Sequence, residues 1–293
     1  MKVLNFGSLN IDHVYRVPHI TQPGETLPGE SYALLAGGKG ANQSAALACA
    51  GAPVWHVGKV GPEGGWLIEK LATLGANTEM IQVGDTPTGH AIIQVDDAGQ
   101  NAIVLFAGAN HAFGRAEIDA AVGNCNPGDW LLLQNETNEV EYMIRTAHGA
   151  GLSVCYNPAP FTPPTGRYPL DLLSTLIVNE TEGEALTRAG EPAGILSSLV
   201  ERLPDCDVIL TLGAAGVTYR CGDETGHIAA PCVDAVDTTA AGDTFIGYYI
   251  AACIAGEDTV EALTRACTAA ALCVTRPGAM DSIPCLAEVE AVP

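Results

Sequence analysis

The stretch WLLLQNETNEVEYMIRTAHGAGLSVCYN, residues 130–157, decides the fold class. It opens with an apolar run at 130–134 and closes with a second one at 153–157, and each run has the length of a buried strand. The segment between them, 138–150, has a helical pattern. A strand, a helix and a second strand in this order predict two parallel strands joined by a covering helix.

The same alternation continues on both sides of this unit. It predicts an α/β protein in which helices flank a central, mostly parallel sheet. The chain has 293 residues, and we expect a single domain that spans residues 1–293. The helix expected at 242–254 is apolar nearly all round, which predicts a buried helix whose N-terminus is available to a site. The other expected strands are 2–6, 53–58, 175–178 and 207–212, and the other expected helices are 41–50, 64–74, 181–188, 195–203 and 258–274.

Two stretches, at about 13–36 and 89–106, break the alternation. The first lacks a helical period and is rich in proline and glycine, and the second reads as a hairpin around the turn at 96–99. We expect the two stretches to pair into a small separate β-sheet that acts as a lid over a site. The alternative is that they extend an edge of the main sheet.

Composition and charge exclude several classes of protein. The chain carries 34 acidic and 13 basic residues, a net charge of −21, so it offers no basic face to a nucleic acid. No apolar run reaches the roughly 18 residues of a membrane span, and residues 1–7 do not form a signal peptide. The ten cysteines include no C-x-x-C pair, which argues against structural zinc and favours buried thiols in the reducing cytoplasm.

The first cluster with chemical meaning is Gly37-Gly38-Lys39-Gly40-Ala41-Asn42, just before an expected helix. Its glycines let the backbone approach a ligand closely, and the helix N-terminus offers unpaired N–H groups. The cluster is not a Walker loop, because Gly40 follows Lys39 where serine or threonine is needed. The first strand is also not followed by G-x-G-x-x-G. The alternative interpretation is a tight turn that caps the helix.

The second cluster, residues 237–244, opens the expected buried helix and reads Asp-Thr-Thr-Ala-Ala-Gly-Asp-Thr. The small residues Ala240, Ala241 and Gly242 leave backbone N–H groups exposed as an anion hole. Asp243 could accept a proton from an alcohol while these amides hold phosphoryl oxygens. The alternative is an ordinary aspartate at a helix N-cap.

Together the two clusters resemble the signatures of the PfkB carbohydrate kinase family, the ribokinase-type sugar kinases. Residues 37–44, followed by Gly51 and Gly61 at the family's spacing, match the first signature, and 237–247 match the second. Tyr248 departs from the second signature, where the family usually has alanine or glycine. The resemblance covers nearly the whole chain. Further matching segments are 7–12, 23–26, 106–110, 157–160, 179–182 and 211–213.

The resemblance implies an ATP-dependent sugar kinase. Asp243 is implied as the general base beside an anion hole at 240–243, and the expected reaction is phosphorylation of D-ribose at O5 to ribose 5-phosphate. The implied sugar-binding residues are Asn10 and Asp12, taken to end the first strand, and Gly38, Lys39, Gly40, Asn42, Glu136 and Asp243. The alternative is a related kinase for deoxyribose, fructose or a nucleoside, although Asn10, Asp12 and Glu136 favour ribose.

The resemblance also implies the cofactors ATP, Mg²⁺ and K⁺. Asn179 and Glu182 would orient Mg²⁺ and the phosphates, although Asn-x-x-Glu by itself could be a helix cap. The implied nucleotide-binding residues are Asn179, Glu182, Thr211, Gly213, Gly216, Gly242 and Cys267. The implied K⁺ site, built largely of backbone carbonyls, comprises Asp237, Thr239, Cys273, Arg276, Gly278 and Ser282.

The expected partner is a small sugar, with neither nucleic acid nor membrane involved. A homodimer through the lid is expected from the apolar residues Ile92, Ile93, Val104 and Phe106 of the hairpin. Two competing classes are a sugar-binding protein without catalysis and a dehydrogenase. The presence of Asp243 with the complete glycine cluster argues against the first, and the missing dinucleotide fingerprint argues against the second.

Overall fold

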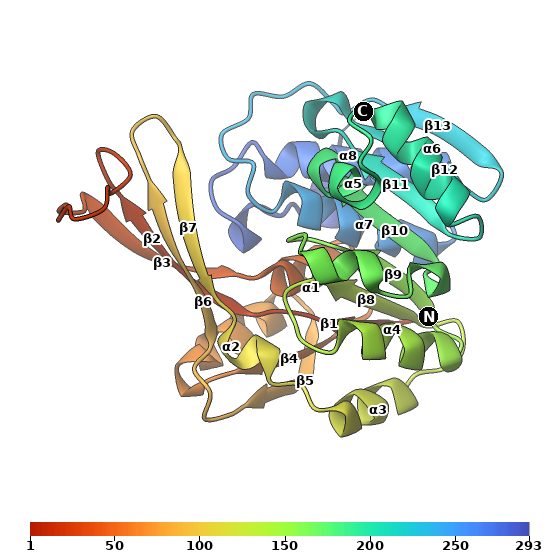
Figure 1. Ribbon diagram of the computed structural model, residues 1–293, viewed down its shortest axis with the longest axis horizontal. Coiled ribbons are helices and arrows are strands. Elements are labelled where there is room, and N and C mark those ends of the chain that lie inside the picture. Colours follow the sequence, from red (N-terminus) through yellow and green to blue (C-terminus); the bar gives the residue numbers. More distant parts are fainter. Residues whose placement is uncertain (293) are drawn as a thin grey trace.

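In the computed structural model, which describes residues 1–292, nine strands form a central sheet in the order β13-β12-β11-β10-β9-β8-β1-β4-β5 (Figure 1). The strands from β11 to β5 pair in parallel, and β12 and β13 are antiparallel. The prediction of a mostly parallel sheet is therefore confirmed. The strands are β1 Val3–Phe6, β4 Val54–Val60, β5 Asn77–Val83, β8 Trp130–Gln134, β9 Ser153–Asn157, β10 Thr175–Asn179, β11 Asp207–Thr211, β12 Val217–Cys221 and β13 Glu224–Ile228.

Helices cover both faces of this sheet because its central strands are apolar on both sides. In β8, Leu132 packs into the core shared with α1, α2, α7 and α8, whereas Leu131 and Leu133 pack into the core shared with α3, α4 and α6. The α-helices are α1 Lys39–Cys49, α2 Gly65–Thr73, α3 Arg115–Gly123, α4 Val140–Gly149, α5 Glu180–Thr187, α6 Pro192–Arg202, α7 Ala241–Ala255, α8 Thr259–Cys273 and α9 Leu286–Glu290. Short 3-10 helices lie at Pro62–Gly64, Gly108–His111, Pro163–Arg167, Leu170–Leu172, Gly213–Ala215 and Met280–Ser282. Within residues 1–292, no helix combines the length and apolar character that crossing a bilayer demands.

All of the predicted main-sheet strands and all of the predicted helices are present, with ends that differ by a few residues. The sequence analysis missed β5, the β12–β13 hairpin, α3 and α9. β5 is an edge strand with no buried residue, and β13 is largely exposed. Neither strand therefore carries the continuous apolar run that reveals a strand buried on both faces.

A second, four-stranded sheet stands beside the central one and projects from it (Figure 1). We call it the lid, and we call the central sheet with its helices the body. The lid has the order β3-β2-β6-β7, so the expected separate sheet is confirmed and an extension of the main sheet edge is wrong. Its strands are β2 Asn10–Arg16, β3 Ser31–Gly37, β6 Gly89–Val95 and β7 Asn101–Phe106.

One prediction about the first strand is corrected. Asn10 and Asp12 were expected at the end of that strand, but β1 ends at Phe6 and both residues lie in β2 of the lid. The chain turns after β1 because Gly7 packs directly against Gly40 at the start of α1, where a side chain on either glycine would overlap the other residue's backbone.

The two faces of the lid carry different rows of side chains. Because side chains alternate along a strand, the row Asp12, Leu35, Ala91 and Leu105 lies on one face, and the next row, with His13, Leu34, Ile92 and Val104, lies on the other. We call the face with Asp12 the inner face and the other the outer face. Ile93 lies on the inner face, opposite to Ile92 and Val104, and the expected dimerisation through the hairpin stays a prediction.

Candidate active site

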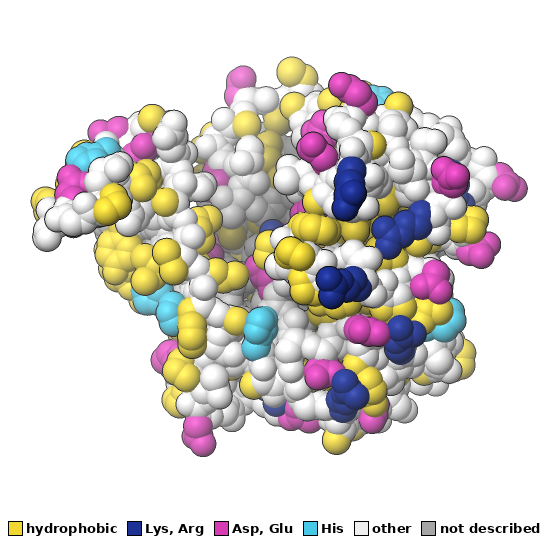
Figure 2. All heavy atoms as spheres, in the orientation of Figure 1, with side chains coloured by type: hydrophobic (Ala, Val, Ile, Leu, Met, Phe, Trp, Pro, Cys, Tyr) yellow, Lys and Arg dark blue, Asp and Glu magenta, His cyan; other side chains and the backbone are white. Residues whose placement is uncertain are grey.

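Polar side chains gather where the parallel strands of the body end. Glu136 follows β8, Asn157 ends β9, Asn179 ends β10 and Thr211 ends β11. All four line a cleft of about 1080 Å³, which opens between the lid and the body (Figure 2). The carboxyl edge of an open α/β sheet is the usual place for a ligand, because loops from several strands converge there.

The glycine cluster forms one wall of this cleft. Gly38, Lys39 and Asn42 line it, and Lys39 is the first residue of α1. Gly38 has a φ of 93°, and a side chain there would lie 2.8 Å from the carbonyl oxygen of Ser8. Only glycine fits this turn without strain. Gly40 does not line the cleft but allows α1 to approach Gly7.

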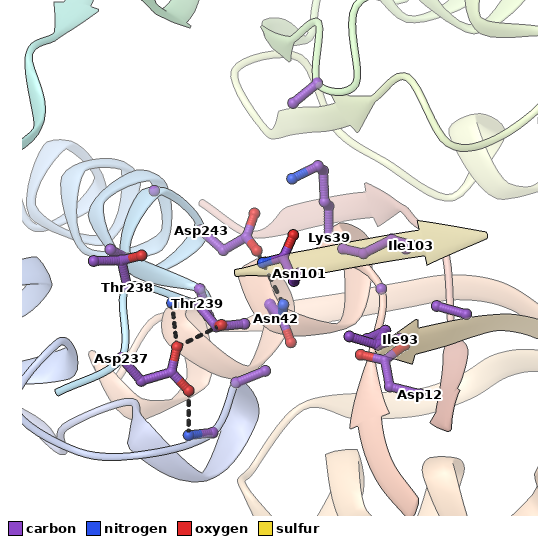
Figure 3. Close-up of a pocket in the computed structure, with 18 of the residues that line it drawn as sticks. Asp12, Lys39, Asn42, Ile93, Asn101, Ile103, Asp237, Thr238, Thr239 and Asp243 are labelled. Carbon is purple, nitrogen blue, oxygen red and sulfur yellow. Dashed lines mark hydrogen bonds between the residues drawn. The ribbon is translucent and has the colours of Figure 1, made fainter. Parts of the chain in front are cut away.

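Asp243 lies in the first turn of α7 and is 7% exposed. Asn42 Nδ2 donates to Asp243 Oδ2 at 3.0 Å, and Gln43 Nε2 donates to Oδ1 at 2.9 Å. Figure 3 shows the carboxylate beside Asn42 at the end of the helix. Each carboxylate oxygen can accept a second hydrogen bond, so the group is held in place while it remains able to accept a proton.

The backbone before α7 forms the expected concave loop. Ala240 caps the helix in the left-handed region with a φ of 60°, an uncommon conformation for a residue with a side chain. Ala240, Ala241 and Gly242 all line the cleft. The N–H groups in the first turn of a helix have no carbonyl partner within that helix, so this end of α7 can hold an anion.

The lid and the loop after β8 bring two carboxyl groups close together. Burial, and then the charge of Glu136, raises the pKa of Asp12 to about 7. Burial also raises the pKa of Glu136, although Lys39 and hydrogen bonds to the carboxylate oppose that change. Glu136 Oε2 accepts bonds from Ser8 Oγ at 2.5 Å and from the Lys39 amide at 2.9 Å. Asn10 Oδ1 accepts a bond from Asn110 Nδ2 at 2.8 Å.

Lys39 is the one cation among the body residues that line the cleft in the described chain. The charge of Asp243, and to a smaller extent those of Glu136 and Glu182, raises the pKa of its ammonium group, while burial acts to lower that pKa. Beside Lys39, the Oδ1 atom of Asn42 is buried without a hydrogen-bond partner. A buried acceptor without a partner is costly, so this oxygen is available to accept a hydrogen bond from a ligand.

Asn179 and Glu182 form the helix cap that the sequence left open as an alternative. Asn179 Oδ1 accepts from the Glu182 amide at 2.8 Å, and Asn179 donates to both carboxylate oxygens of Glu182. Both residues also line the cleft, and burial raises the pKa of Glu182. The cap thus holds a carboxylate at the cleft wall, so the two interpretations are compatible.

The other predicted nucleotide residues differ in position. Thr211 and Gly242 line the cleft, and Gly213 opens the short helix just after β11. A side chain on Gly216 would overlap the carbonyl oxygen of Ile228, which gives this glycine a packing role. Cys267 is 4% exposed, packs in the hydrophobic core with α7 and is not among the residues that line the cleft, so its contact with a nucleotide stays a prediction.

The six predicted cation residues lie around the loop before α7 and the loop after α8. Asp237 Oδ1 accepts from the amide and hydroxyl of Thr239, and Asp237 Oδ2 accepts from the Gly278 amide at 2.9 Å (Figure 3). Burial acts to raise the pKa of Asp237, but these hydrogen bonds outweigh it and lower the pKa. Cys273 Sγ lies 3.1 Å from Ser282 Oγ. The guanidinium of Arg276 pairs with Glu288, which leaves only its backbone for a cation.

Several cleft residues escaped the sequence analysis. Asn157 lines the cleft between β8 and β10, and Val14, Ile93 and Ile103 line it from the inner face of the lid. Asn157 is the last residue of a predicted strand and Glu136 comes just after another, so the sequence position of Asn157 could have indicated it. Gln43, which contacts Asp243, sits in the glycine motif but lies in the core rather than in the cleft.

The fold and the site define a class of protein. A helix N-terminus that can hold an anion, a buried carboxylate beside it and polar side chains under a lid are the parts of a kinase for a small hydroxylated acceptor. The chain belongs to the pfkB family of carbohydrate kinases, whose family model matches residues 1–286.

Relatives and solved structures agree with this assignment. The chain is 38% identical over 287 residues to the ribokinase of Haemophilus influenzae, a match that covers 95% of this chain and 94% of the relative. The ribokinase structure from Thermotoga maritima superposes with a TM-score of 0.90 at 35% identity, over 99% of this chain and 98% of that one. The Arabidopsis thaliana ribokinase structure, complexed with ribose and ATP, gives a TM-score of 0.87 at 29% identity, over 99% and 97% of the two chains.

Proposed function

We propose that this protein is an ATP-dependent kinase that transfers the γ-phosphoryl group of ATP to O5 of D-ribose, giving ribose 5-phosphate. The observation that carries the proposal is the buried Asp243 carboxylate beside the anion-binding N-terminus of α7, in a cleft that is closed on one side by a lid. The similarity to ribokinases over nearly the whole chain supports ribose as the acceptor.

The sugar binds between the lid and α1 in this proposal. Asn10 and Asp12 of the lid, with Asn42 and Glu136 of the body, supply acceptors and donors for its hydroxyl groups. The unpartnered Oδ1 of Asn42 supports this role, because a hydroxyl group can donate to it. A site built from paired polar groups discriminates strongly, since a substrate that lacks one hydroxyl leaves a buried group unpaired.

The residues of this chain then carry out the transfer. Asp243 accepts the proton of the attacking hydroxyl group, and the amides at 240–243 stabilise charge on the moving phosphoryl group. Lys39 supplies a positive charge beside the carboxylates of Asp243 and Glu136. Positioning and electrostatics dominate phosphoryl transfer, because the transition state is loose and needs little covalent help.

The nucleotide is proposed to lie against the ends of β10 and β11, near Asn179, Thr211 and Gly213. Asn179 and Glu182 would orient Mg²⁺, which prefers few carboxylate ligands and supplies charge neutralisation at the phosphates when bound. Their oxygens are hard donors at the cleft wall, so these residues fit the ion. Five carboxylates and two cationic side chains line the cleft of the described chain, which makes such neutralisation necessary for an anionic substrate: Asp12, Glu136, Glu182, Asp237 and Asp243 with Arg16 and Lys39.

We also propose a K⁺ site beside the anion hole. The carboxylate of Asp237, kept ionised by its hydrogen bonds, and the loop of Gly278 supply oxygen ligands of the right kind. Thr239, Cys273, Arg276 and Ser282 complete the proposed site largely through backbone carbonyls. Cys267 remains a proposed neighbour of the nucleotide.

The oligomeric state and the location are further parts of the proposal. Residues 1–293 act as one domain with a lid, and two copies associate through the outer lid face, where Leu34 is 50%, Val104 68% and Phe106 49% exposed. Such a contiguous apolar surface is usually covered by a partner. The ten free thiols support a cytoplasmic location, because that compartment keeps cysteines reduced.

The alternative acceptors are deoxyribose, fructose and nucleosides, and one screen separates them. ADP production is measured at equal concentrations of each acceptor with Mg·ATP, and kcat/KM is compared. We expect ribose to exceed each competitor by about tenfold or more, with ribose 5-phosphate as the product by NMR. A higher kcat/KM for another acceptor reassigns the substrate, and no ADP with any acceptor refutes the kinase.

A further inference from the structure

A layer of fully buried polar side chains lies at the contact between α1 and the central sheet. Its members come from four elements, and the surrounding core is otherwise apolar, with Ala45, Ala46 and Leu47 of α1 packed around it. The members are Asn5 of β1, Gln43 and Ser44 of α1, His56 of β4 and Gln134 of β8, each 0% exposed. Burial of polar groups costs free energy unless each finds a partner, so a layer of this kind calls for an explanation beyond packing.

The side chains of this layer are joined by consecutive hydrogen bonds. Ser44 Oγ contacts His56 Nδ1 at 2.8 Å and accepts from Asn5 Nδ2 at 2.7 Å. Gln134 Nε2 donates to Asn5 Oδ1 at 3.0 Å and to Gln43 Oε1 at 2.7 Å. Burial lowers the pKa of His56 to about 4, so the ring is neutral near pH 7 and its Nδ1 can accept the serine proton.

The network ends on Asp243. Gln43 Nε2 donates to Asp243 Oδ1 at 2.9 Å, while its Oε1 is occupied by the donor from Gln134. This arrangement fixes the orientation of the amide, because a flipped amide would place its oxygen against the carboxylate and its nitrogen against another donor. Gln43 is fully buried, so it contacts the carboxylate from the side that a ligand in the cleft cannot reach.

Other groups around Asp243 have roles of their own. Asn42, which bonds to Oδ2, lines the cleft and is free to change partners when a sugar binds. The charged groups that act on this site are Lys39 of α1, Glu136 after β8 and Glu182 of α5. Of the two side-chain donors to this carboxylate, Gln43 is thus the one that does not line the cleft.

We propose that Gln43 is a positioning residue for the phosphoryl transfer. It holds Asp243 in the orientation needed to receive the proton, and Gln134 in turn holds the Gln43 amide. The proposal rests on the role of Asp243 as the base. Because Gln43 contacts neither substrate, its loss should lower kcat and leave the KM values for sugar and ATP nearly unchanged.

The test uses Gln43→Met, which nearly keeps the size of the side chain and removes all three of its hydrogen bonds, those to Asp243 and Asn157 and the one from Gln134. We expect kcat to fall about 10- to 100-fold, since a hydrogen bond to a charged group is worth about that factor. KM for ribose and for ATP should change less than about threefold. Ser44→Ala is the matched control, because it also breaks the buried network on α1 but does not contact Asp243. It should lower the melting temperature to a similar degree and leave kcat unchanged.

A second variant, Gln43→Glu, gives a readout that a structural role would not produce. The new carboxyl group can donate to Asp243 only while it is protonated. At a pH above its pKa, two like charges would face each other. We expect this variant to be most active at low pH and to lose kcat as pH rises, opposite to an enzyme that needs a free base. Circular dichroism at each pH separates this loss from unfolding.

The outcomes distinguish this proposal from the proposed function. If Asp243→Asn keeps near wild-type turnover, the assignment of the base fails. If Asp243→Asn is inactive but Gln43→Met keeps kcat within about threefold of wild type, only the positioning role of Gln43 fails. Equal losses of kcat in Gln43→Met and Ser44→Ala also overturn that role, since they indicate general disruption. If Gln43→Met does not fold, the pH profile of Gln43→Glu decides in the same way.

Discussion

The body and the lid each supply half of the cleft, but they build it in different ways. In the body, Asp243 is 7% exposed and each of its oxygens is held by a side chain from α1. In the lid, Ile103 and Leu105 remain 55% and 46% exposed and reach the cleft from a free-standing hairpin. The body holds Asp243 with buried hydrogen bonds, whereas the lid presents a partly exposed apolar surface to the cleft.

The difference in burial suggests that the body and the lid have different roles. Groups that need exact placement for proton transfer and charge stabilisation lie where packing and hydrogen bonds hold them. In the proposed function, the lid supplies only part of the sugar site, and a lid of this kind can open and close. Changes in the body should therefore alter kcat or folding, and changes in the lid should alter KM or association.

The largest effect is expected for Asp243→Asn. Without the base, kcat should fall at least about 10²- to 10⁴-fold, while ribose still binds by calorimetry. Asp258→Asn is the control: it makes the same change of charge at the N-cap of α8, far from the cleft, and asparagine also caps a helix. Turnover near that of wild type in Asp243→Asn would contradict the view that the chemistry resides in the body.

Folding of the body should be most sensitive at Gly40. A side chain there would overlap the backbone of Gly7 and Ser8, so Gly40→Ala should lower the free energy of unfolding by about 3 kcal/mol, as measured by denaturant titration. Gly65→Ala places a methyl group in open space at the start of α2 and should be neutral or stabilising. Equal stabilities of the two variants would show that the contact between α1 and the turn after β1 is looser than described.

In the lid, Asp12 should make sugar binding depend on pH. Its pKa of about 7 lies above the ordinary 3.8, so the folded chain binds an extra proton between these values. Above about pH 7 the buried carboxyl group is ionised, and this lowers the free energy of unfolding by its full amount. Asp12→Asn should therefore raise the melting temperature at pH 8 but not near pH 4. In wild type, KM for ribose should rise as pH falls below about 7, because protonation turns one acceptor oxygen of the carboxylate into an O–H donor.

Asp97→Asn, at the exposed turn of the lid hairpin, is the control for Asp12 and should leave both pH profiles unchanged. In Asp12→Asn, KM should be higher than in wild type and should not vary with pH over this range. A pH-dependent KM that persists in Asp12→Asn would assign the dependence to another group, with Glu136 the nearest carboxyl.

The smallest effects come from two neighbours in β7 that face opposite sides of the lid. Ile103→Thr, on the inner face, should raise KM for ribose several-fold, since removing one apolar group costs about 1 kcal/mol. Val104→Thr, on the outer face, should weaken dimerisation by a similar free energy without changing KM. Light scattering against concentration and steady-state kinetics measure the two effects. A monomeric wild type, or the same phenotype in both variants, would remove the distinction between the faces.

Much of the body could be predicted from the sequence because its pattern is local. The apolar runs at 130–134 and 153–157 correspond to β8 and β9, since buried parallel strands are apolar on both faces. The lid was anticipated as a separate sheet because 13–36 and 89–106 lack that pattern. The edge strand β5 was missed because it buries neither face, so its sequence resembles that of a loop.

The sequence by itself determined the order of strands and helices and the two motifs that border the cleft, because periodicity and glycine content act over a few residues. Only the tertiary structure decided that Gln43 bonds to Asp243 across 200 residues of chain, and that Ile93 rather than Ile92 faces the cleft. The first fact depends on how α1 packs against α7, and the second on which side of the lid meets the body. Both arrangements are set by packing across the whole molecule, and a single sequence does not display it.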